Sequence, residues 1–317
     1  MTVIRVRILA FAVTYAVTGA VCACYAKHTH TSPEFPDIPG MPANGTAAVL
    51  FAPGIVSTGD IFASTFTPDG RTVVFTKFAP PRPMTLMAST FRDNAWGSPV
   101  PLPFSGTHRD LDPSFSPDGA RLYFSSWRPS GPSSADTTNG VDTWYSDRSA
   151  NAWSPPVRLA EPLNSPNAET FPNATNRGVL YFDSNRSTDR RRLVYRAEPR
   201  PDGTLGLPVL LDPTINADSG ASNLFVDPDE RYVVFGAVRP EGSGGLDLYI
   251  SWRTMSGWTS PRNLGPQVNT TGTEFCPFVS RDGRFLFFTR VSPPTAPPVV
   301  RNVYVVRFDG LRERLKP

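Results

Sequence analysis

The chain has 317 residues, of which 39% are apolar and 19% charged, so it can form a sizeable core. Proline (35 residues) and glycine (24 residues) are abundant, which favours many short strands joined by turns over long helices. The formal net charge is only +3, and the arginines are scattered without interleaved aromatic residues, so nucleic acid is not expected as a partner.

Residues 1–24 have the composition of an export signal. Arg5 and Arg7 precede an apolar run that extends from Ile8 to about Cys24 and ends among small residues. The run is short for a retained membrane span, so we expect a bacterial secretory signal and a periplasmic protein. The same end also resembles a lipobox with Cys24 as the lipidated residue. A lipid anchor in the cell envelope is therefore the alternative, and the only membrane association we expect.

Residues 25–46 are rich in proline, serine and glycine and lack any apolar period. This composition predicts a flexible tether between the signal and a domain at 47–317. Once the signal is removed or Cys24 is modified, Cys276 is the one unmodified thiol that remains. We therefore expect no disulfide within the domain.

One pattern recurs five times within the domain. A turn of the Asp-Gly type separates two apolar segments, and the second segment ends in a phenylalanine. The closing phenylalanines are spaced by 49, 58, 53 and 53 residues: Phe75, Phe124, Phe182, Phe235 and Phe288. A period of this length predicts one repeated supersecondary unit, and the blade of a β-propeller fits it.

Two further signatures supply the remaining strands of each unit. Alternating segments that open at Asp142 and Asp247 predict a third strand, and a Trp-x-x-Pro-x-x-Leu pattern or its close variant predicts a fourth in four units. The fifth unit ends without that pattern, but residues 48–61 resemble the piece it lacks. We therefore predict a single all-β propeller of five four-stranded blades, closed by the N-terminal strand, with six blades as the alternative.

The repeats resemble the WD-like repeats of TolB-type bacterial propellers. The best copies are DLDPSFSPDGARLYFSSWRP (110–129) and ETFPNATNRGVLYFDSNR (169–186), and the resemblance covers about 47–309. It implies an exported propeller but no particular activity, because such propellers serve many roles. The chain departs from the pattern at Ile61 and Ala221, where a polar or acidic residue is usual.

Acidic residues occupy one repeated position at the start of three predicted inner strands: Asp110, Glu169 and Glu274, with Asp112 close by. Inner strands of a propeller begin near its axis, so these carboxylates are expected at one mouth of the central channel. They could bond to backbone amides at each blade start, or bind a ligand there. A third possibility is acid–base chemistry on a glycan, because the arrangement is similar to that of five-bladed glycoside hydrolases.

Arginines recur as well. Arg128, Arg186 and Arg239 each stand four residues after a closing phenylalanine, and Asp142 and Asp247 open the next strand in two of these blades. We expect bridges within the blade from these arginines to the aspartates, which would shape the loop between them. An anion-binding ring is the alternative.

The remaining inventory offers no other chemistry. His108 is the only histidine in the domain, so a histidine-rich zinc site or an ordinary Ser-His-Asp triad is not expected, and neither is a cofactor. The sequence thus predicts a non-enzymatic exported propeller that binds a protein or a cell-envelope glycan at one end of its ring. A glycan-processing enzyme and a structural accessory subunit of an envelope complex are the alternatives.

Overall fold

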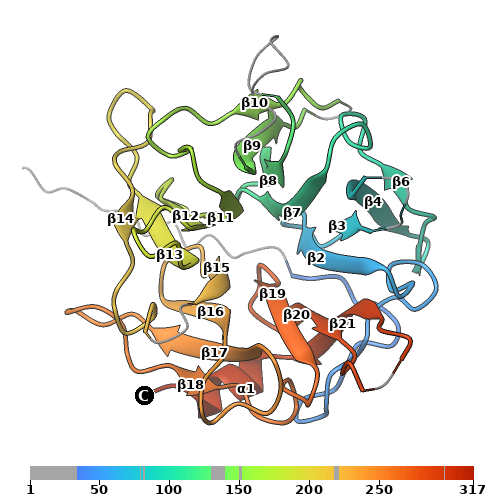
Figure 1. Cartoon of the computed structure of the whole chain (residues 1–317). Coiled ribbons are helices and arrows are strands. Elements are labelled where there is room, and N and C mark those ends of the chain that lie inside the picture. Colours follow the sequence, from blue (N-terminus) through green and yellow to red (C-terminus); the bar gives the residue numbers. More distant parts are fainter. Residues whose placement is uncertain are drawn as a thin grey trace, which may run out of the picture. The chain divides into compact units, whose positions relative to one another are not determined.

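The computed structural model describes residues 34–78, 80, 83–129, 140–149, 152–217, 221–295 and 297–317. The predicted signal with Cys24 and the first part of the tether lie outside these residues. Five small antiparallel sheets surround a central axis (Figure 1). The fold is therefore the all-β, five-bladed propeller that the spacing of the repeats predicts, and the six-bladed alternative is wrong.

Each blade runs from an inner strand at the axis to a short outer strand. Blade 1 has β2 (Ile61–Phe66), β3 (Thr72–Lys77), β4 (Thr85–Arg92) and β6 (Val100–Pro101), with β5 (Ala95–Trp96) beside β4. Blade 2 has β7 (Asp110–Phe115), β8 (Arg121–Ser126), β9 (Asp142–Asp147) and β10 (Val157–Arg158). Blade 3 has β11 (Glu169–Ala174), β12 (Leu180–Ser184), β13 (Leu193–Ala197) and β14 (Val209–Leu210). Blade 4 has β15 (Ser222–Val226), β16 (Tyr232–Ala237), β17 (Asp247–Trp252) and β18 (Arg262–Asn263).

Blade 5 closes the ring with strands from both ends of the domain. It has β19 (Thr273–Val279), β20 (Phe285–Val291), β21 (Arg301–Arg307) and β1 (Val49–Leu50), which pairs antiparallel with β21. The predicted N-terminal closure is confirmed, and it leaves β21 without an open edge. One short helix, α1 (Asp309–Arg314), follows in the described chain. No described helix has the length and apolar character needed to cross a membrane.

The segment 34–46 makes a second contact across the seam between blades 5 and 1. The Phe35 ring is 3% exposed and lies 5.3 Å from the ring of Phe66 in blade 1. Its backbone N–H donates to Asp282 Oδ2 of blade 5 at 2.8 Å. Gly70 makes room for the ring, because a Cβ there would lie 2.6 Å from it. This part of the predicted tether is therefore packed on the propeller, which its composition did not indicate.

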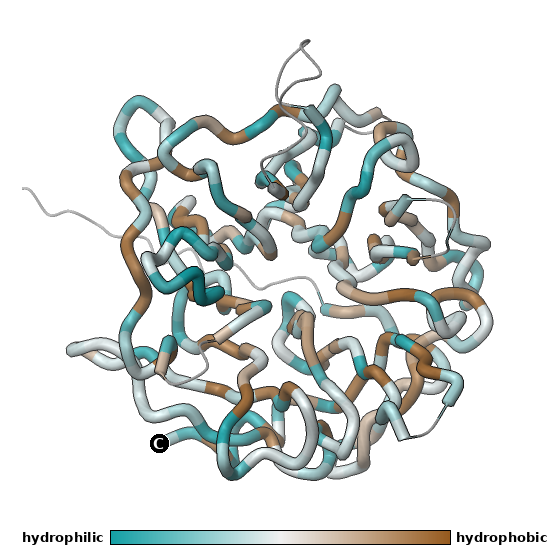
Figure 2. Tube along the Cα trace, in the orientation of Figure 1, coloured by the Kyte–Doolittle hydropathy of each residue, from teal (hydrophilic) through white to brown (hydrophobic). Residues whose placement is uncertain are grey.

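Apolar residues recur along the strands of every blade (Figure 2). The five closing phenylalanines are at most 1% exposed. They lie in clusters that neighbouring blades share, such as the cluster that joins Val74 of blade 1 to Leu122 and Trp144 of blade 2. The core is thus a set of apolar seams between sheets, as expected for repeats that cannot bury a face alone.

The two faces of the ring carry different connections. Ile61 pairs with Lys77 and Asp110 with Ser126, so inner strands begin at the face where second strands end. We call this the upper face. The lower face carries the Asp-Gly turns, in which Gly119 has a φ of +72° and Asp118 accepts a hydrogen bond from the backbone N–H of Ala120 at 3.0 Å. These contacts give the turn aspartate a conformational role.

Candidate binding site at the upper face

The three repeated acids begin the inner strands of blades 2, 3 and 5, but none of them faces open solvent. Asp110, Glu169 and Glu274 are each 0% exposed. Each forms an ion pair with an arginine of its own blade: Asp110 Oδ1 with Arg128 Nη2 at 2.8 Å, Glu169 Oε1 with Arg186 Nη2 at 3.1 Å, and Glu274 Oε1 with Arg290 Nε at 2.8 Å.

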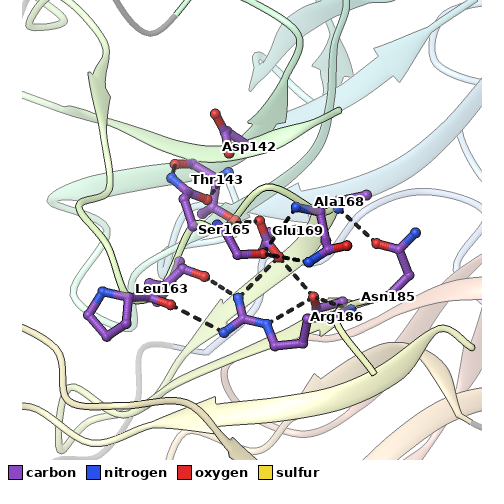
Figure 3. Close-up of polar contacts among 12 residues, drawn as sticks. Asp142, Thr143, Leu163, Ser165, Ala168, Glu169, Asn185 and Arg186 are labelled. Atoms are coloured by element: carbon purple, nitrogen blue, oxygen red, sulfur yellow. Dashed lines mark hydrogen bonds and ion pairs between the residues drawn. The ribbon is translucent and has the colours of Figure 1, made fainter. Parts of the chain in front are cut away.

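Figure 3 shows the polar contacts of one of these carboxylates, that of Glu169. Glu169 accepts hydrogen bonds from the backbone N–H of Ser165 at 2.9 Å, from Ser165 Oγ at 2.7 Å and from Ser184 Oγ at 2.8 Å. Burial raises the pKa of Glu169, while these hydrogen bonds and the Arg186 charge oppose the rise. Arg186 also donates to the carbonyl of Leu163, so the cluster ties the loop before β11 to the end of β12.

The partners expected for the arginines are wrong. Arg128 binds Asp110 instead of Asp142, whose carboxylate pairs with Arg158 at 2.7 Å. The guanidinium of Arg128 also donates to the carbonyl of Phe104 at 3.3 Å, in the loop that leads to β7. This acceptor lies on the inner-strand side of β8, so the guanidinium of Arg128 is held at Asp110 although it also lies over the Trp144 ring of the third strand, 5.4 Å away.

Arg239 and Asp247 do not form the expected bridge either. Asp247 Oδ2 accepts a hydrogen bond from the backbone N–H of Ser243. Within the described part of the chain, Arg239 donates only to the carbonyls of Thr214 and Ile215, at 3.5 Å each, and its Nε has no partner there.

A ring of β-bulges lies below the upper face. In every blade, the residue two positions after the repeated acid position has a positive φ, between +47° and +54°. These residues are Ala63, Asp112, Phe171, Asn223 and Cys276. The pairing register shifts at these points in the strands, as at a bulge. Ala63, Phe171 and Cys276 come from three blades yet belong to one apolar cluster, so this ring surrounds the axis.

Two carboxyl groups are buried near this ring without a close ion pair. Asp112 is 5% exposed and Asp183 of β12 is 0% exposed. Burial raises the pKa of Asp112 to about 6 and that of Asp183 to about 7, and the charge of Arg192 opposes both shifts. Asp183 Oδ2 accepts from the backbone N–H of Asn223 at 2.8 Å, but its Oδ1 has no partner in the described part of the chain.

The sequence pattern was not used to predict a role for Asp183, although the sequence contains a signal for one. It directly follows a closing phenylalanine, and the other blades carry small uncharged residues there: Thr76, Ser125, Gly236 and Thr289. An acid within a row of small residues departs from the repeat. It is therefore a better indicator of a special role than an acid that the repeat preserves.

The upper end of the axis has an apolar side and a polar side. Phe275 and Leu111 are partly exposed and pack on the apolar axial cluster, and Phe275 stacks on Phe62 with ring centroids 6.3 Å apart. On the blade 3 side the exposed Arg192 donates to Thr170 Oγ1 at 2.7 Å. Burial raises the pKa of Cys276 well above its usual value, so its thiol remains protonated.

A metal centre finds no support in the residues that can be described. No group of three or more histidine, cysteine, aspartate or glutamate side chains among them is placed to hold a metal ion.

No protein-family model matches the sequence, and a search of curated proteins finds no match. Solved structures do match. An α-L-arabinofuranosidase from Lactobacillus brevis aligns with a TM-score of 0.51 at 14% identity, over 81% of this chain and 93% of that one. A protein described as a glycoside hydrolase aligns with a TM-score of 0.52 at 10% identity, over 84% and 95% of the two chains.

TolB from Acinetobacter baumannii is also similar, with a TM-score of 0.47 and 17% identity over 78% of this chain. The match covers 55% of that protein, so this chain spans about half of its length. At such identities the likenesses show the fold alone. The chain is a five-bladed β-propeller with TolB and glycoside hydrolases among its structural neighbours.

Proposed function

We propose that the protein is an exported, non-enzymatic propeller that binds a cell-envelope glycan at the upper end of its axis. The observation that carries this proposal is that the axial apolar cluster, with the partly exposed side chains of Phe275 and Leu111, adjoins the same ring of bulges as the buried carboxyl groups of Asp112 and Asp183. A sugar ring presents an apolar C–H face and a rim of hydroxyl groups. Apolar walls with a few polar groups are typical of small-ligand sites.

Asp110, Glu169 and Glu274 do not take part in this proposed site. Each is fully buried and held by an arginine, so it cannot reach a glycosidic oxygen without breaking an internal ion pair. Their contacts are those of the structural alternative, in which each acid fixes the start of its blade.

Export is part of the proposal and rests on the composition of residues 1–24. The mature protein would be free in the periplasm or anchored through a lipid on Cys24. Mass spectrometry of the N-terminal peptide from the native cell fraction distinguishes the two. An unprocessed Met1 would contradict both.

A glycan-processing enzyme is the second candidate, and Asp112 favours it. Asp112 is 5% exposed whereas Asp183 is 0% exposed, and its pKa of about 6 would let it donate a proton near neutral pH, as a general acid must. The two roles differ in outcome. A binding protein releases the glycan intact, whereas a hydrolase shortens it.

Calorimetric titration with oligosaccharides prepared from bacterial envelopes tests both candidates. We expect Phe275→Ala to weaken binding at least tenfold, because it removes one apolar wall. Leu207→Ala, at a 70% exposed position just before β14, serves as the matched control and should leave binding unchanged. New reducing ends in the wild type that are absent in Asp112→Asn would favour the hydrolase over the binding protein. Equal binding by both alanine variants would contradict the proposed site.

A further inference from the structure

Two equivalent tyrosines lie at neighbouring seams of the ring. Tyr123 of blade 2 and Tyr181 of blade 3 each directly precede the closing phenylalanine of their blade. Each lies beside the lower turn of the next blade. The hydroxyl group of Tyr181 donates to Glu230 Oε1 of blade 4 at 2.6 Å, and Tyr123 lines a groove together with Gly178 of blade 3. The two seams can therefore be compared position by position.

Between blades 3 and 4 the protein supplies its own carboxylate. Glu230 ends the lower turn of blade 4, where the other four blades have glycine, and it is 7% exposed. Its Oε2 accepts from Arg177 Nε at 2.9 Å, while its Oε1 accepts from Tyr181. A tyrosine hydroxyl group and a guanidinium thus hold one carboxylate at this seam, through charge-assisted hydrogen bonds.

Between blades 2 and 3 the same position carries no side chain. Gly178 and Glu230 close their turns in the same way, because their backbone N–H groups donate to the carbonyls of Thr175 and Asp227 at 2.9 and 2.7 Å. Both residues have a positive φ, +78° and +57°. A Cβ at Gly178 would have only ordinary contacts, the nearest with Pro199 at 3.6 Å. The place that Glu230 takes in the next seam is therefore left to the groove.

This groove has the size of a small-ligand site. Its volume is about 660 Å³, and all the residues that line it belong to the described part of the chain. Pockets for small ligands typically have about 300–1,000 Å³. Because its lining includes β10, the outer strand of blade 2, we call it the rim groove. Tyr123, Leu159 and Leu205 are partly exposed in its wall and pack on an apolar cluster of blade 3.

The rim groove also offers donors for an acidic group. Burial raises the pKa of Tyr123, so its hydroxyl group stays protonated and can donate at neutral pH. No carboxylate of the described chain accepts a hydrogen bond from it, in contrast to Tyr181. Arg121 lines the groove over the Tyr145 ring, 3.7 Å from its centroid, and pairs with Asp147 at 2.6 Å.

The remaining charges of the rim groove are of both signs. Arg200 lines it and forms no ion pair with any described residue. Glu161 and Asp202 line it too and are exposed, although Asp202 already accepts from Thr204 Oγ1 at 2.7 Å. These two acids weaken the attraction for an anion. Binding therefore depends on short-range contacts with the hydroxyl group and the apolar wall.

We propose that the rim groove binds a small organic acid, whose carboxylate takes the position that Glu230 fills at the next seam. The carboxylate would accept from the Tyr123 hydroxyl group, and the body of the ligand would lie on Leu159 and Leu205. This body can be a hydrocarbon or a sugar ring. Gly178 belongs to a turn of the lower face, so this site is distinct from the glycan site proposed at the upper face and does not rest on it.

Calorimetric titration of the whole protein with benzoate tests the site. Benzoate should bind saturably, whereas benzyl alcohol, which has the same ring without the charge, should not bind. Gly178→Glu supplies a carboxylate from the chain, as Glu230 does, and should abolish benzoate binding. Gly265→Glu is the matched control, because Gly265 has the same φ of +78° with open space around it and does not line the groove. This control should bind benzoate like the wild type.

Tyr123→Phe gives a second variant that keeps the ring and removes only the hydroxyl group. It should weaken benzoate binding at least tenfold, and it tests the site even if Gly178→Glu does not fold. Absence of saturable binding by both benzoate and glucuronate overturns the site, and so does binding that is unchanged in these two variants.

Glucuronate and glucose identify the body of the ligand. Glucuronate that binds more tightly than benzoate, with no response to glucose, supports a sugar acid, whereas tighter or equal binding of benzoate supports an acid with a hydrocarbon body. Phe275→Ala leaves the rim groove intact and should not change benzoate binding. Either proposal can therefore fail alone.

Discussion

Blades 3 and 4 share one strand framework but differ in the polar groups it carries. Blade 3 has Glu169, Asp183 and Ser184 where blade 4 has Ala221, Gly236 and Ala237 at the corresponding positions. Both keep the arginine and the two aromatic rings beneath it. In blade 3 the arginine is held in an internal ion pair with Glu169. In blade 4 alanine replaces the acid of that pair.

The difference shows where function is to be sought in a repeat protein. A charged residue that returns in blade after blade with the same partners stabilises each unit, as Glu169 and Arg186 do. A departure from the repeat is not explained in this way. Asp183 adds an acid that the other blades lack, and Ala221 removes one that blades 2, 3 and 5 possess. The glycan site proposed at the upper end of the axis lies at the first of these departures.

The largest expected effect comes from removing the acid of blade 3. Glu169→Ala leaves Arg186 without a counter-charge at a buried position and should reduce the free energy of unfolding by about 3–5 kcal/mol. Arg239→Gln in blade 4 breaks no ion pair and should cost about 1 kcal/mol or less. Urea denaturation of the two variants compares them directly. Equal losses would mean that the two arginines have the same role after all.

The sequence predicts the strand framework that blades 3 and 4 share, but not the polar contacts in which they differ. The five closing phenylalanines and the Asp-Gly turns are local patterns, so blade number, strand order and closure by β1 follow from them. Glu169 and Arg186 are 17 residues apart and meet only because the antiparallel register brings them together. Their joint recurrence in blades 2 and 3 is the signal that could have identified the pair.

Other features have no counterpart in the repeated pattern of the sequence. Phe35 lies in a proline-rich stretch, and its pocket is formed by residues from both ends of the chain, such as Phe66 and Phe287. The raised pKa of Asp183 depends on complete burial at the axis, which only the assembled ring produces. Neither feature can be predicted from one repeat considered alone.

The second effect concerns Asp183 and is a dependence of stability on pH. Its folded pKa of about 7 exceeds the ordinary value of 3.8, so the folded state holds the proton more tightly than the unfolded chain. The resulting stabilisation is complete below about pH 4 and is lost as the pH rises through 7. Since one pKa unit corresponds to about 1.4 kcal/mol, the upper limit of this loss is about 4 kcal/mol.

Asp183→Asn should remove most of this dependence and raise stability at pH 8 relative to the wild type. Asp112, with a pKa of about 6, should leave a smaller slope of the same sign. Thermal unfolding between pH 4 and 8 provides the measurement. An unchanged profile in the variant would show that Asp183 is ionised or solvated in the folded protein.

The third effect follows from converting blade 3 into a copy of blade 4. Glu169→Ala combined with Ser184→Ala recreates the environment of Arg239 around Arg186. If the truncation opens a cavity beside Arg186 that admits a carboxylate, acetate at ten times its Kd should restore about 1.4 kcal/mol of the lost stability. Chloride at the same ionic strength is the control for general screening. Equal recovery with both salts would argue against a carboxylate site.

The smallest effect tests the first residue of the third strand, where blade 2 has Asp142 and blade 4 has Asp247. Asp142 pairs with Arg158, and the two side chains are 17% and 25% exposed. Partly exposed pairs of this kind contribute little, so Asp142→Asn should cost about 1 kcal/mol or less. A double-mutant cycle between Asp142 and Arg158 should show coupling, whereas a cycle between Asp142 and Arg128 should show almost none, because Arg128 pairs with Asp110. Measurable coupling between Asp142 and Arg128 would instead support a bridge to the third strand. It would also contradict the difference drawn here between blade 2, which neutralises its arginine at the inner strand, and blade 4, which does not.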